Sequence, residues 1–370
     1  MALQNSIDTD AAAERLAIWL TTQWPGVQNM KVQDLTVPAS AGLSNETVLF
    51  NAAWQRDGQS DSRAMVARVQ PAGEGVFPTY DLKKEAKVLG ALGANGTVPV
   101  PEIYSYAEDR SVFGAPFMVM ERVDGRIPSD DPPFTAGGWV LDLEASQRTK
   151  MWQSTIEVLA SIHGTDWKGL GLDFLDTPDY GSGLDAQLAY WAEFFNWAAA
   201  GEPNPTIEHA LTWLVDHKPT DTEDKVLNWG DARVGNVIYG EDLAPVAVLD
   251  WEMVTLAPRE LDLGWWFFLE RHHTEGIGLP TPPGIPDRAT TVARYEELTG
   301  YRVQNLEYYE IFAGARLSII MVRAAHMMIA AGLLPPDAPM ALSNPASQLL
   351  AKLLGLPAPT GTTTSFIGNR

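Results

Sequence analysis

Residues 228–236 read NWGDARVGN, and this stretch of the 370-residue chain decides the fold. Asp231 stands within it, and Asn236 follows five residues later. Asp250 comes fourteen residues after Asn236, at the end of a second apolar run, and a short polar turn separates the two runs. The pattern predicts a strand, a loop, a hairpin and a strand. Such a hairpin places Asn236 and Asp250 at the same end of one small sheet.

These residues have the chemistry of a phosphoryl-transfer site. Magnesium takes oxygen ligands, keeps several waters, and uses one or two protein side chains together with the phosphates of a nucleotide. Asn236 and Asp250 suit that role, and Asp231 can accept the proton of an attacking hydroxyl group or orient it. Arg233 in the same loop can place a positive charge on the transferring group. We therefore predict a base at Asp231, an assisting cation at Arg233 and metal ligands at the other two residues.

The main alternative is that these polar residues fill solvated turns. An aspartate followed five residues later by an asparagine is common, because acidic and amide side chains stabilise many turns. That interpretation does not explain why both candidate metal ligands fall at strand ends of one hairpin. The hairpin context therefore favours the chemical interpretation.

The chain resembles the aminoglycoside phosphotransferase family, which belongs to a protein-kinase-like group that also contains choline kinases and homoserine kinases. The family signature is H-G-D-x-x-x-x-N, followed by an apolar strand that ends in I-D and then Trp, Phe or Cys. Asp231, Asn236 and Asp250 match this signature, whereas Trp229 stands at the usual histidine. We expect Trp229 to alter the packing of the loop without removing a catalytic group.

The resemblance also has implications for the fold. Residues 258–263, PRELDL, resemble the family segment G-D-P-x-x-D-L, so Asp262 is expected to brace the backbone of the catalytic loop. The implied fold is α+β and bilobal, like a protein kinase, with a small antiparallel-sheet N-lobe containing one helix and a larger, mainly helical C-lobe. We expect residues 1–122 to form the nucleotide-binding N-lobe. Residues 123–370 are expected to form the C-lobe with the catalytic loop and the acceptor site.

The first third of the chain predicts a sheet. Its apolar, β-rich runs lie at residues 32–38, 47–54 and 63–69. Asp57 and Gly58 predict the turn between the last two runs. The loop 41–47, AGLSNET, can lay backbone amides over phosphates, which makes Ser44 and Asn45 candidate nucleotide contacts.

Arg68 and Glu85 form a predicted pair in the same region. The resemblance places Arg68 at the family's phosphate-binding lysine or arginine, and Glu85 lies in a helix expected to begin near Pro78. We expect these two side chains to form an ion pair. The alternative is a surface arginine and a solvated helix glutamate.

The apolar run 116–120 turns polar and reaches Gly125. It resembles the hinge between lobes, whose backbone hydrogen-bonds adenine in the related enzymes. Glu121 and Val123 are therefore candidate nucleotide contacts through their main-chain groups. An ordinary edge strand is the alternative.

The composition limits the possible functions. A hydrophobic content of 45% with 13 tryptophans is enough for a large core, and the absence of cysteine excludes disulfides and cysteine nucleophiles. The net charge of −21 argues against nucleic acid as a partner but permits a cationic acceptor. The first twenty residues lack the pattern of a secretory signal, so we expect a cytoplasmic protein. Charged residues interrupt the apolar segment 306–331, which predicts a buried helix rather than a membrane span.

Beyond residue 123 the periodicity predicts a mostly helical region. Helices are expected at 143–163, 184–200, from Asn204 and Pro205 onward, at 286–299 and at 306–331. Two Pro/Gly-rich stretches, 124–138 and 278–286, are either lids over an acceptor site or surface connections. The aromatic runs 190–197 and 264–270 are expected to be mostly core. If a few of those rings face the site, the acceptor pocket favours a hydrophobic alcohol. His272 and His273 are expected at a helix end rather than in a transition-metal site.

The predicted function is a kinase that transfers the γ-phosphoryl group of ATP or GTP, with Mg²⁺, to a hydroxyl group of a small molecule. A nucleotide-binding pseudoenzyme is one alternative, but retention of Asp231, Asn236 and Asp250 argues against it. A protein kinase is another. The sequence has no long activation segment between Asp250 and Glu260, and D-W-E replaces D-F-G, so protein acceptors are not expected.

Overall fold

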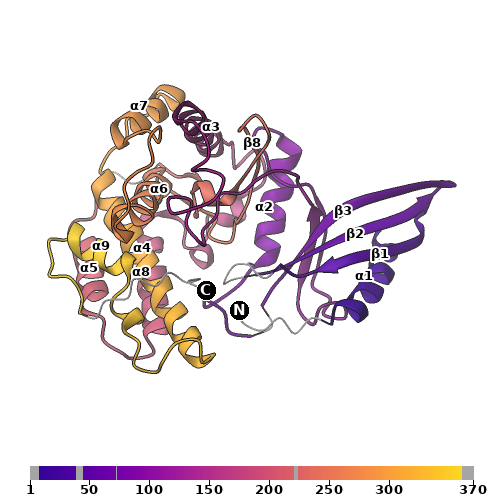
Figure 1. Ribbon diagram of the computed structural model, residues 1–370, viewed down its shortest axis with the longest axis horizontal. Helices are drawn as coiled ribbons and strands as arrows, with labels where there is room; N and C mark the ends of the chain where they lie inside the picture. Colours follow the sequence, from indigo (N-terminus) through magenta and orange to yellow (C-terminus); the bar gives the residue numbers. More distant parts are fainter. Residues whose placement is uncertain (1–7, 39–44, 72, 221–223, 361–370) are drawn as a thin grey trace. The chain divides into compact units, whose positions relative to one another are not determined.

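The computed structural model describes residues 8–38, 45–71, 73–220 and 224–360 (Figure 1). The chain divides into two units. Unit 1 consists of Met1–Ala94 and Pro101–Val123, and unit 2 consists of Asn95–Val100 and Asp124–Arg370. The boundary expected from the sequence lay after residue 122, and the assignment of 95–100 to unit 2 was not anticipated.

Unit 1 is built on a five-stranded antiparallel sheet with the strand order β1-β2-β3-β5-β4. Its elements are α1 (Thr9–Gln23), β1 (Gln28–Thr36), β2 (Glu46–Arg56), β3 (Gln59–Val69), α2 (Leu82–Asn95), β4 (Ile103–Ala107) and β5 (Phe117–Glu121). Arg56 pairs with Gln59, so Asp57 and Gly58 form the predicted two-residue turn, with φ of 51° and 76°. That turn is confirmed. The prediction of one helix in this part is wrong, because α1 is a second one.

α1 contributes to the hydrophobic core beside the sheet. Asp8 caps the helix by accepting a hydrogen bond from its first turn at 3.1 Å. Leu16, Trp19 and Leu20 share one face of the helix and are buried among the strands, where the rings of Trp19 and Phe117 lie 4.7 Å apart. The cap and the helical spacing are local signals, so this helix was predictable from the sequence.

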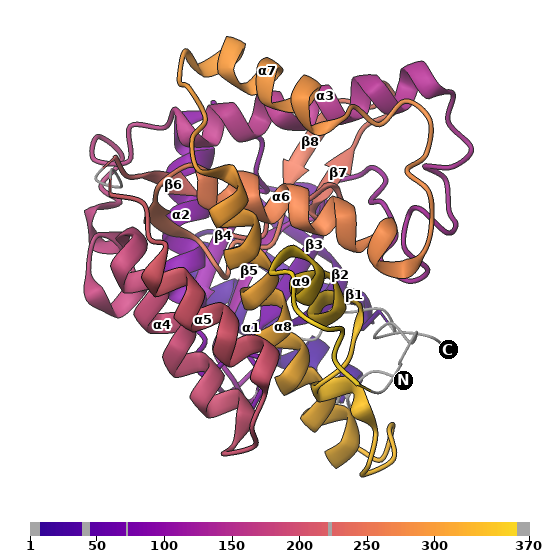
Figure 2. The ribbon, with the colours of Figure 1, turned by 90° about the vertical axis from the view of Figure 1, so that its left-hand side faces the viewer.

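Unit 2 is mainly helical and carries two small antiparallel sheets, β6-β9 and β7-β8 (Figure 2). Its helices are α3 (Ala145–His163), α4 (Gly183–Ala199), α5 (Pro205–Asp216), α6 (Glu260–His272), α7 (Arg288–Thr299), α8 (Leu306–Ala330) and α9 (Pro345–Leu353). Its strands are β6 (Val226–Asn228), β7 (Val237–Tyr239), β8 (Pro245–Val248) and β9 (Thr255–Ala257). Short 3-10 turns occur at Asp173–Leu175, Pro178–Tyr180, Val234–Asn236, Glu275–Ile277 and Pro339–Ala341.

The five predicted helices of this region correspond to α3, α4, α5, α7 and α8. Asn204 caps α5 by accepting from the backbone N–H of Ile207 at 3.2 Å, and Pro205 occupies the first position, as predicted. α9 was not predicted, and α6 was anticipated only through the helix end expected at His272 and His273, where it does end. Every residue of α6 from Glu260 to Leu269 is buried, so these residues do not alternate between polar and apolar with the period of a helix.

α8 is the central helix of unit 2 and contacts α4, α5, α6 and α9. By length and composition it is the one helix in the described part of the chain that resembles a membrane span, and 67% of its most apolar window is buried inside the protein. Its buried Glu310 is paired with Arg271 at 2.8 Å and Arg288 at 2.7 Å. These observations fit the expected core helix.

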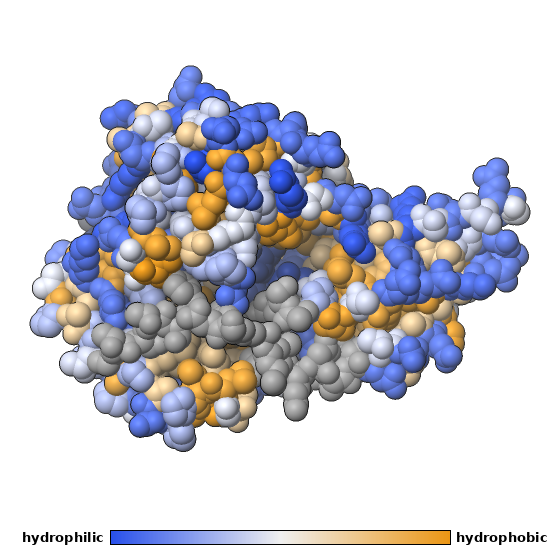
Figure 3. Space-filling model, in the orientation of Figure 1, coloured by the Kyte–Doolittle hydropathy of each residue, from blue (hydrophilic) through white to orange (hydrophobic). Residues whose placement is uncertain are grey.

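Polar residues predominate along the outline of the face shown in Figure 3, with apolar patches between them. Among the described residues, large apolar side chains are exposed at single positions such as Ile18 and Val215. Isolated exposures of this kind are common on folded proteins and do not by themselves indicate a partner.

Side chains of unit 2 hold the segments around the two Pro/Gly-rich stretches. The buried Arg148 on α3 donates to the carbonyl of Leu143 at 2.6 Å and to that of Pro283 at 2.7 Å. The hydroxyl of Thr135 donates to the carbonyl of His273. The stretches are thus anchored to helices, and their role as lids stays a prediction.

Candidate active site

The loop after β6 has a backbone that requires glycine. Asn228 ends β6, and its side-chain amide donates to the carbonyl of Ala257 on β9 at 2.8 Å. Gly230 has a φ of 96°, and a Cβ at this position would collide with the backbone of Met253. Because only glycine fits this left-handed position and this close approach, the chain can turn here. The turn presents Asp231 as the next residue.

Three side chains hold the carboxylate of Asp231. Its Oδ1 accepts a hydrogen bond from the indole Nε1 of Trp265 at 2.6 Å. Its Oδ2 accepts from Nδ2 of Asn236 at 2.7 Å and from Nε of Arg233 at 3.1 Å. The structure therefore brings together three predicted residues, Asp231, Arg233 and Asn236, and adds Trp265 from the aromatic run 264–270, which was expected to be mostly core.

Asn236 and Asp250 lie at the same end of the β7-β8 ladder. Val237 pairs with Val248, and the next backbone bond runs from the N–H of Leu249 to the carbonyl of Asn236 at 2.8 Å. Asp250 follows directly. The hairpin predicted from the sequence is confirmed, together with the placement of both residues at one end of it.

The donor set at this end of the hairpin fits magnesium. Asn236 commits its Nδ2 to Asp231, so Oδ1 is the atom that it can offer to a metal. Asp250 has a φ of 61°, a strained conformation for a non-glycine residue that is frequent at functional sites. Within the described ranges no group of three or more His, Cys, Asp or Glu side chains is arranged to hold a metal. One amide and one carboxylate oxygen suit magnesium, which takes its other ligands from water and phosphates.

Asp262 supports the loop from α6, as the resemblance implied. Its Oδ2 accepts from the backbone N–H of Trp229 at 2.7 Å, and its Oδ1 accepts from that of Gly230 at 2.8 Å. Nε2 of His163 lies 3.2 Å from Oδ2 of Asp262, and Nδ1 of His163 lies 2.6 Å from the hydroxyl of Tyr295. His163 is the last residue of α3, and it links α7 to this buried carboxylate.

Trp229, at the usual histidine of the signature, joins the two halves of the site. Its Nε1 donates to the carbonyl of Leu249 at 2.7 Å, one residue before Asp250. Its ring lies 6.3 Å from that of Trp251. Trp229 thus supplies a hydrogen bond from the loop to the segment that follows β8.

We expect Trp229→Phe to lower the free energy of unfolding by about 1 kcal/mol, because the ring stays and one hydrogen bond is lost. Turnover should also fall, since the loop is no longer tied to Leu249. Trp251→Phe is the matched control, because its Nε1 donates within its own segment to Val248 at 3.1 Å. Urea unfolding and kcat of both variants test this. Equal effects of the two substitutions on kcat would contradict the linking role.

Arg233 is held between two carboxylates. Its Nη1 donates to Oδ1 of Asp130 at 2.6 Å, and its Nε donates to Asp231. Burial alone would lower the pKa of Arg233, but the charges of Asp231 and Asp130 outweigh it and raise the pKa above its usual value. Arg233 is therefore a permanent cation beside the candidate base.

A small pocket adjoins Arg233. It is lined by Phe134, Arg233, Val234, Trp266, Leu269, Glu270 and His273. The carboxyl of Glu270 accepts from Nε1 of Trp152 at 2.5 Å, and burial raises the pKa of Glu270 to about 8. Burial also lowers the pKa of His273 to about 3. At neutral pH both side chains are uncharged, so Arg233 is the cation of a largely apolar pocket.

Glu270→Gln should make stability less dependent on pH. In the folded protein Glu270 keeps its proton up to about pH 8, whereas its ordinary pKa is 4.5. Its contribution to stability is therefore fully present below pH 4.5 and is lost as the pH rises through about 8. Between pH 5 and pH 9 the free energy of unfolding of the variant should rise, relative to that of wild type, by on the order of 2 kcal/mol. One pKa unit corresponds to about 1.4 kcal/mol, and the sum is reduced because Glu270 is partly exposed. Urea unfolding at pH 5, 7 and 9 measures this. A constant difference would contradict a neutral Glu270.

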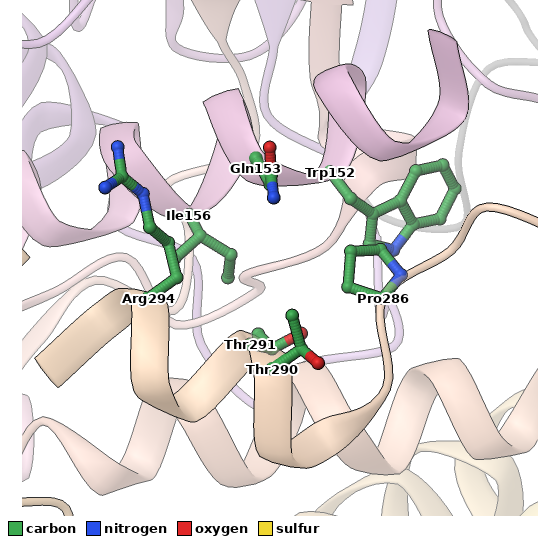
Figure 4. Close-up of a pocket in the computed structure, with 7 residues that line it drawn as sticks. All are labelled: Trp152, Gln153, Ile156, Pro286, Thr290, Thr291 and Arg294. Atoms are coloured by element: carbon green, nitrogen blue, oxygen red, sulfur yellow. The ribbon is translucent and has the colours of Figure 1, made fainter. Parts of the chain in front are cut away.

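A second pocket, between α3 and α7, has a different lining (Figure 4). It is lined by Trp152, Gln153, Ile156, Pro286, Thr290, Thr291 and Arg294. This lining includes no carboxylate that can act as a base or a metal ligand. We therefore assign the chemistry to the loop around Asp231.

Three of the nucleotide candidates meet in unit 1. Nε of Arg68 lies 3.4 Å from Oε2 of Glu85, which is buried, and this confirms the predicted ion pair. With its amide oriented so that oxygen faces Arg68, Asn45 accepts from Nε at 3.2 Å and from Nη2 at 3.1 Å. Ser44 lies outside the described residues.

Glu121 and Val123 follow β5. The backbone N–H of Glu121 donates to the carbonyl of Glu102 at 2.8 Å, so this donor is already used within the sheet. A main-chain contact from Glu121 to a nucleotide would have to come from its carbonyl group.

Comparisons with known proteins agree with this geometry. The sequence model of a family described as the phosphotransferase enzyme family matches residues 36–303. Relatives include acyl-CoA dehydrogenase family member 11 of Rattus norvegicus, 30% identical over 253 residues, and family member 10 of Mus musculus, 33% identical over 226 residues. These matches cover 67% and 60% of this chain but 30% and 19% of the relatives. The chain thus spans less than a third of the length of these relatives.

Similar solved structures include a candidate aminoglycoside phosphotransferase from Ralstonia eutropha, with a TM-score of 0.67, 24% identity, and coverage of 92% of this chain and 98% of that one. Another is a thermostable mutant of an aminoglycoside phosphotransferase in complex with ADP and hygromycin B. Its TM-score is 0.55 at 15% identity, with coverage of 92% of this chain and 98% of the other. At these identities the likeness concerns the fold, and it confirms the predicted α+β, kinase-like fold.

Proposed function

This chain belongs to the phosphotransferase enzyme family, and from that premise we propose that it transfers the γ-phosphoryl group of ATP to a hydroxyl group of a small molecule. The observation that carries the proposal is the environment of Asp231. Its carboxylate accepts hydrogen bonds from Trp265, Asn236 and Arg233, beside the hairpin end that bears Asp250. A carboxylate oriented in this way can receive a proton from an acceptor hydroxyl group.

In the proposed reaction the acceptor oxygen forms a bond to the γ-phosphorus while the bond from that phosphorus to the β,γ-bridging oxygen breaks. The hydroxyl proton passes to Asp231, and ADP leaves. Arg233 stabilises charge on the transferring group. Its guanidinium must then donate to the phosphoryl group as well as to Asp130 and Asp231. Magnesium, when bound by Asn236 and Asp250, would neutralise phosphate charge.

The donor contacts that we propose in unit 1 follow from the family resemblance. Arg68, oriented by Glu85 and Asn45, would contact phosphates. The carbonyl of Glu121 and the main-chain groups of Val123 would contact the base. GTP is the second donor in the test below.

The pocket beside Arg233 favours an acceptor with an apolar body. Phe134, Trp266 and Leu269 line it, and Glu270 is uncharged at neutral pH. A polycationic sugar gains little from a neutral carboxyl group, because attraction between charges is absent. We therefore propose a hydrophobic or weakly polar alcohol rather than an aminoglycoside.

The names of the relatives suggest one group of alcohols to test. They are called acyl-CoA dehydrogenase family members, and this chain matches less than a third of their length. A hydroxylated acyl compound, either free or as a thioester, has the apolar body that the pocket favours. We propose it as one member of the acceptor panel.

The test is nucleotide consumption with magnesium, using ATP and GTP against aminoglycosides, amino alcohols, apolar alcohols and hydroxylated acyl compounds. We expect turnover that depends on an acceptor, with apolar alcohols or hydroxylated acyl compounds preferred. Efficient phosphorylation of aminoglycosides would contradict the acceptor class. Nucleotide binding without turnover on any acceptor would instead favour a pseudoenzyme.

A further inference from the structure

Arg316 of α8 is a cation buried beneath the catalytic loop. Its side chain is 1% exposed, and its Nη2 donates to the carbonyl of Gly230 at 3.1 Å. Nε and Nη1 of Arg316 have no hydrogen-bond partner among the residues that the structure describes. Burying a charge is costly unless its surroundings compensate for it, so an arginine at this place calls for an explanation.

Two tryptophan rings surround this guanidinium. Its centre lies 4.5 Å from the ring of Trp265 and 5.1 Å from that of Trp191. Burial lowers the pKa of Arg316 to about 10, although the charges of Asp262 and Asp231 oppose the shift. Arg316 is thus still charged at neutral pH, and the ring faces supply part of the stabilisation that hydrogen bonds do not.

Trp265 connects this cation to the candidate base. One face of its ring is near Arg316, and its Nε1 donates to Oδ1 of Asp231 at 2.6 Å. A cation over the ring draws electron density from the indole, which strengthens its N–H as a donor. Through Gly230 and Trp265, Arg316 therefore acts on the backbone before Asp231 and on its side chain.

We propose that Arg316 and Trp265 are positioning residues, which together hold the carboxylate of Asp231 in the orientation that accepts the acceptor's proton. This inference rests on the proposed function for its kinetic consequence. The contacts that it invokes all lie within unit 2 and can also be tested without turnover.

The kinetic test compares four single variants and the double variant Trp265→Phe/Arg316→Met in the full chain. Trp265→Phe keeps an aromatic ring near Arg316 and removes the N–H that reaches Asp231. Arg316→Met keeps an extended apolar side chain and removes the charge, whereas Arg316→Lys restores a charge. Arg323→Met is the matched control, because Arg323 also lies on α8 and its guanidinium is 4.4 Å from the ring of another tryptophan, Trp197.

We expect Trp265→Phe and Arg316→Met each to lower kcat about 10- to 100-fold, with KM for nucleotide and acceptor within about threefold of wild type, because a misplaced base slows the chemical step. Arg316→Lys should recover part of the loss, and Arg323→Met should leave kcat unchanged. In the double variant the fold decrease in kcat should be smaller than the product of the fold decreases in the two single variants, since both residues act on Asp231. Unchanged kcat in Trp265→Phe, or multiplicative losses in the double variant, would overturn the inference.

A second measurement is independent of activity. In a ¹H–¹⁵N spectrum the indole signal of Trp265, identified by its loss in Trp265→Phe, should lie downfield because its proton is bonded to a carboxylate. Arg316→Lys and Asp231→Asn should each move it upfield. A signal that does not move in either variant would overturn the inference, whereas absent turnover with the expected shifts would overturn only the proposed function. If Arg316→Met does not fold, Arg316→Lys and Trp265→Phe still test the positioning role of Arg316 and Trp265.

Discussion

Asp231→Asn is expected to lower kcat by about 10²–10⁴-fold, which is the usual contribution of a positioned general base. The amide cannot take up the proton of the acceptor hydroxyl group. The amide also has only one oxygen that can accept the hydrogen bonds of Trp265, Asn236 and Arg233, whereas the carboxylate uses two oxygens for them. Steady-state turnover with the best acceptor of the panel measures the effect.

Nucleotide binding distinguishes a lost base from a damaged protein. The affinity for ATP with magnesium, measured by calorimetry, should change less than about threefold in Asp231→Asn, and the unfolding temperature should stay close to that of wild type. Turnover that equals wild type would show that another group accepts the proton. Loss of both binding and turnover would point to a structural role for Asp231.

Asp250→Asn is expected to lower kcat by about 10²–10³-fold and to raise the magnesium concentration needed for half-maximal rate at least tenfold, because the charged ligand that we propose for magnesium becomes neutral. Asparagine is the informative substitution here. Asp250 has a φ of 61°, and asparagine tolerates this left-handed conformation better than most residues. The change therefore alters charge with little added backbone strain.

Asp57→Asn provides a matched control for Asp250→Asn. Asp57 also has a left-handed backbone, with a φ of 51°, but it lies in the β2-β3 turn of unit 1. Its substitution should leave both kcat and the magnesium dependence unchanged. An Asp250 variant with wild-type magnesium dependence would contradict its assignment as a ligand.

Local signals in the sequence predicted much of this structure. The Asp57-Gly58 turn and the cap and proline of α5 depend on neighbouring residues, and both were correct. The placement of Asn236 and Asp250 followed from the geometry of one hairpin. Asp262 was predicted through a family resemblance, and its hydrogen bonds to the loop are present.

The features that were missed depend on contacts between distant segments or on uniform burial. Trp265 lies 34 residues from Asp231 and within a helix whose residues are buried on all sides, so no periodicity marks it out. The same burial concealed where α6 begins, although its end near His272 was expected. Arg316 interrupts an apolar helix, and its role depends on two tryptophans from other helices. Such partners become visible only when the chain is folded.

Phosphoryl transfer to a small molecule can be observed directly by ³¹P NMR of the reaction with ATP, magnesium and an acceptor that sustains nucleotide consumption. Phosphoryl transfer to a hydroxyl group predicts a phosphate monoester signal that couples to protons of the acceptor, grows in step with ADP, and is absent with Asp231→Asn. ADP accompanied by inorganic phosphate alone, or no consumption of ATP or GTP with any acceptor, would contradict the assignment of this chain as a small-molecule kinase.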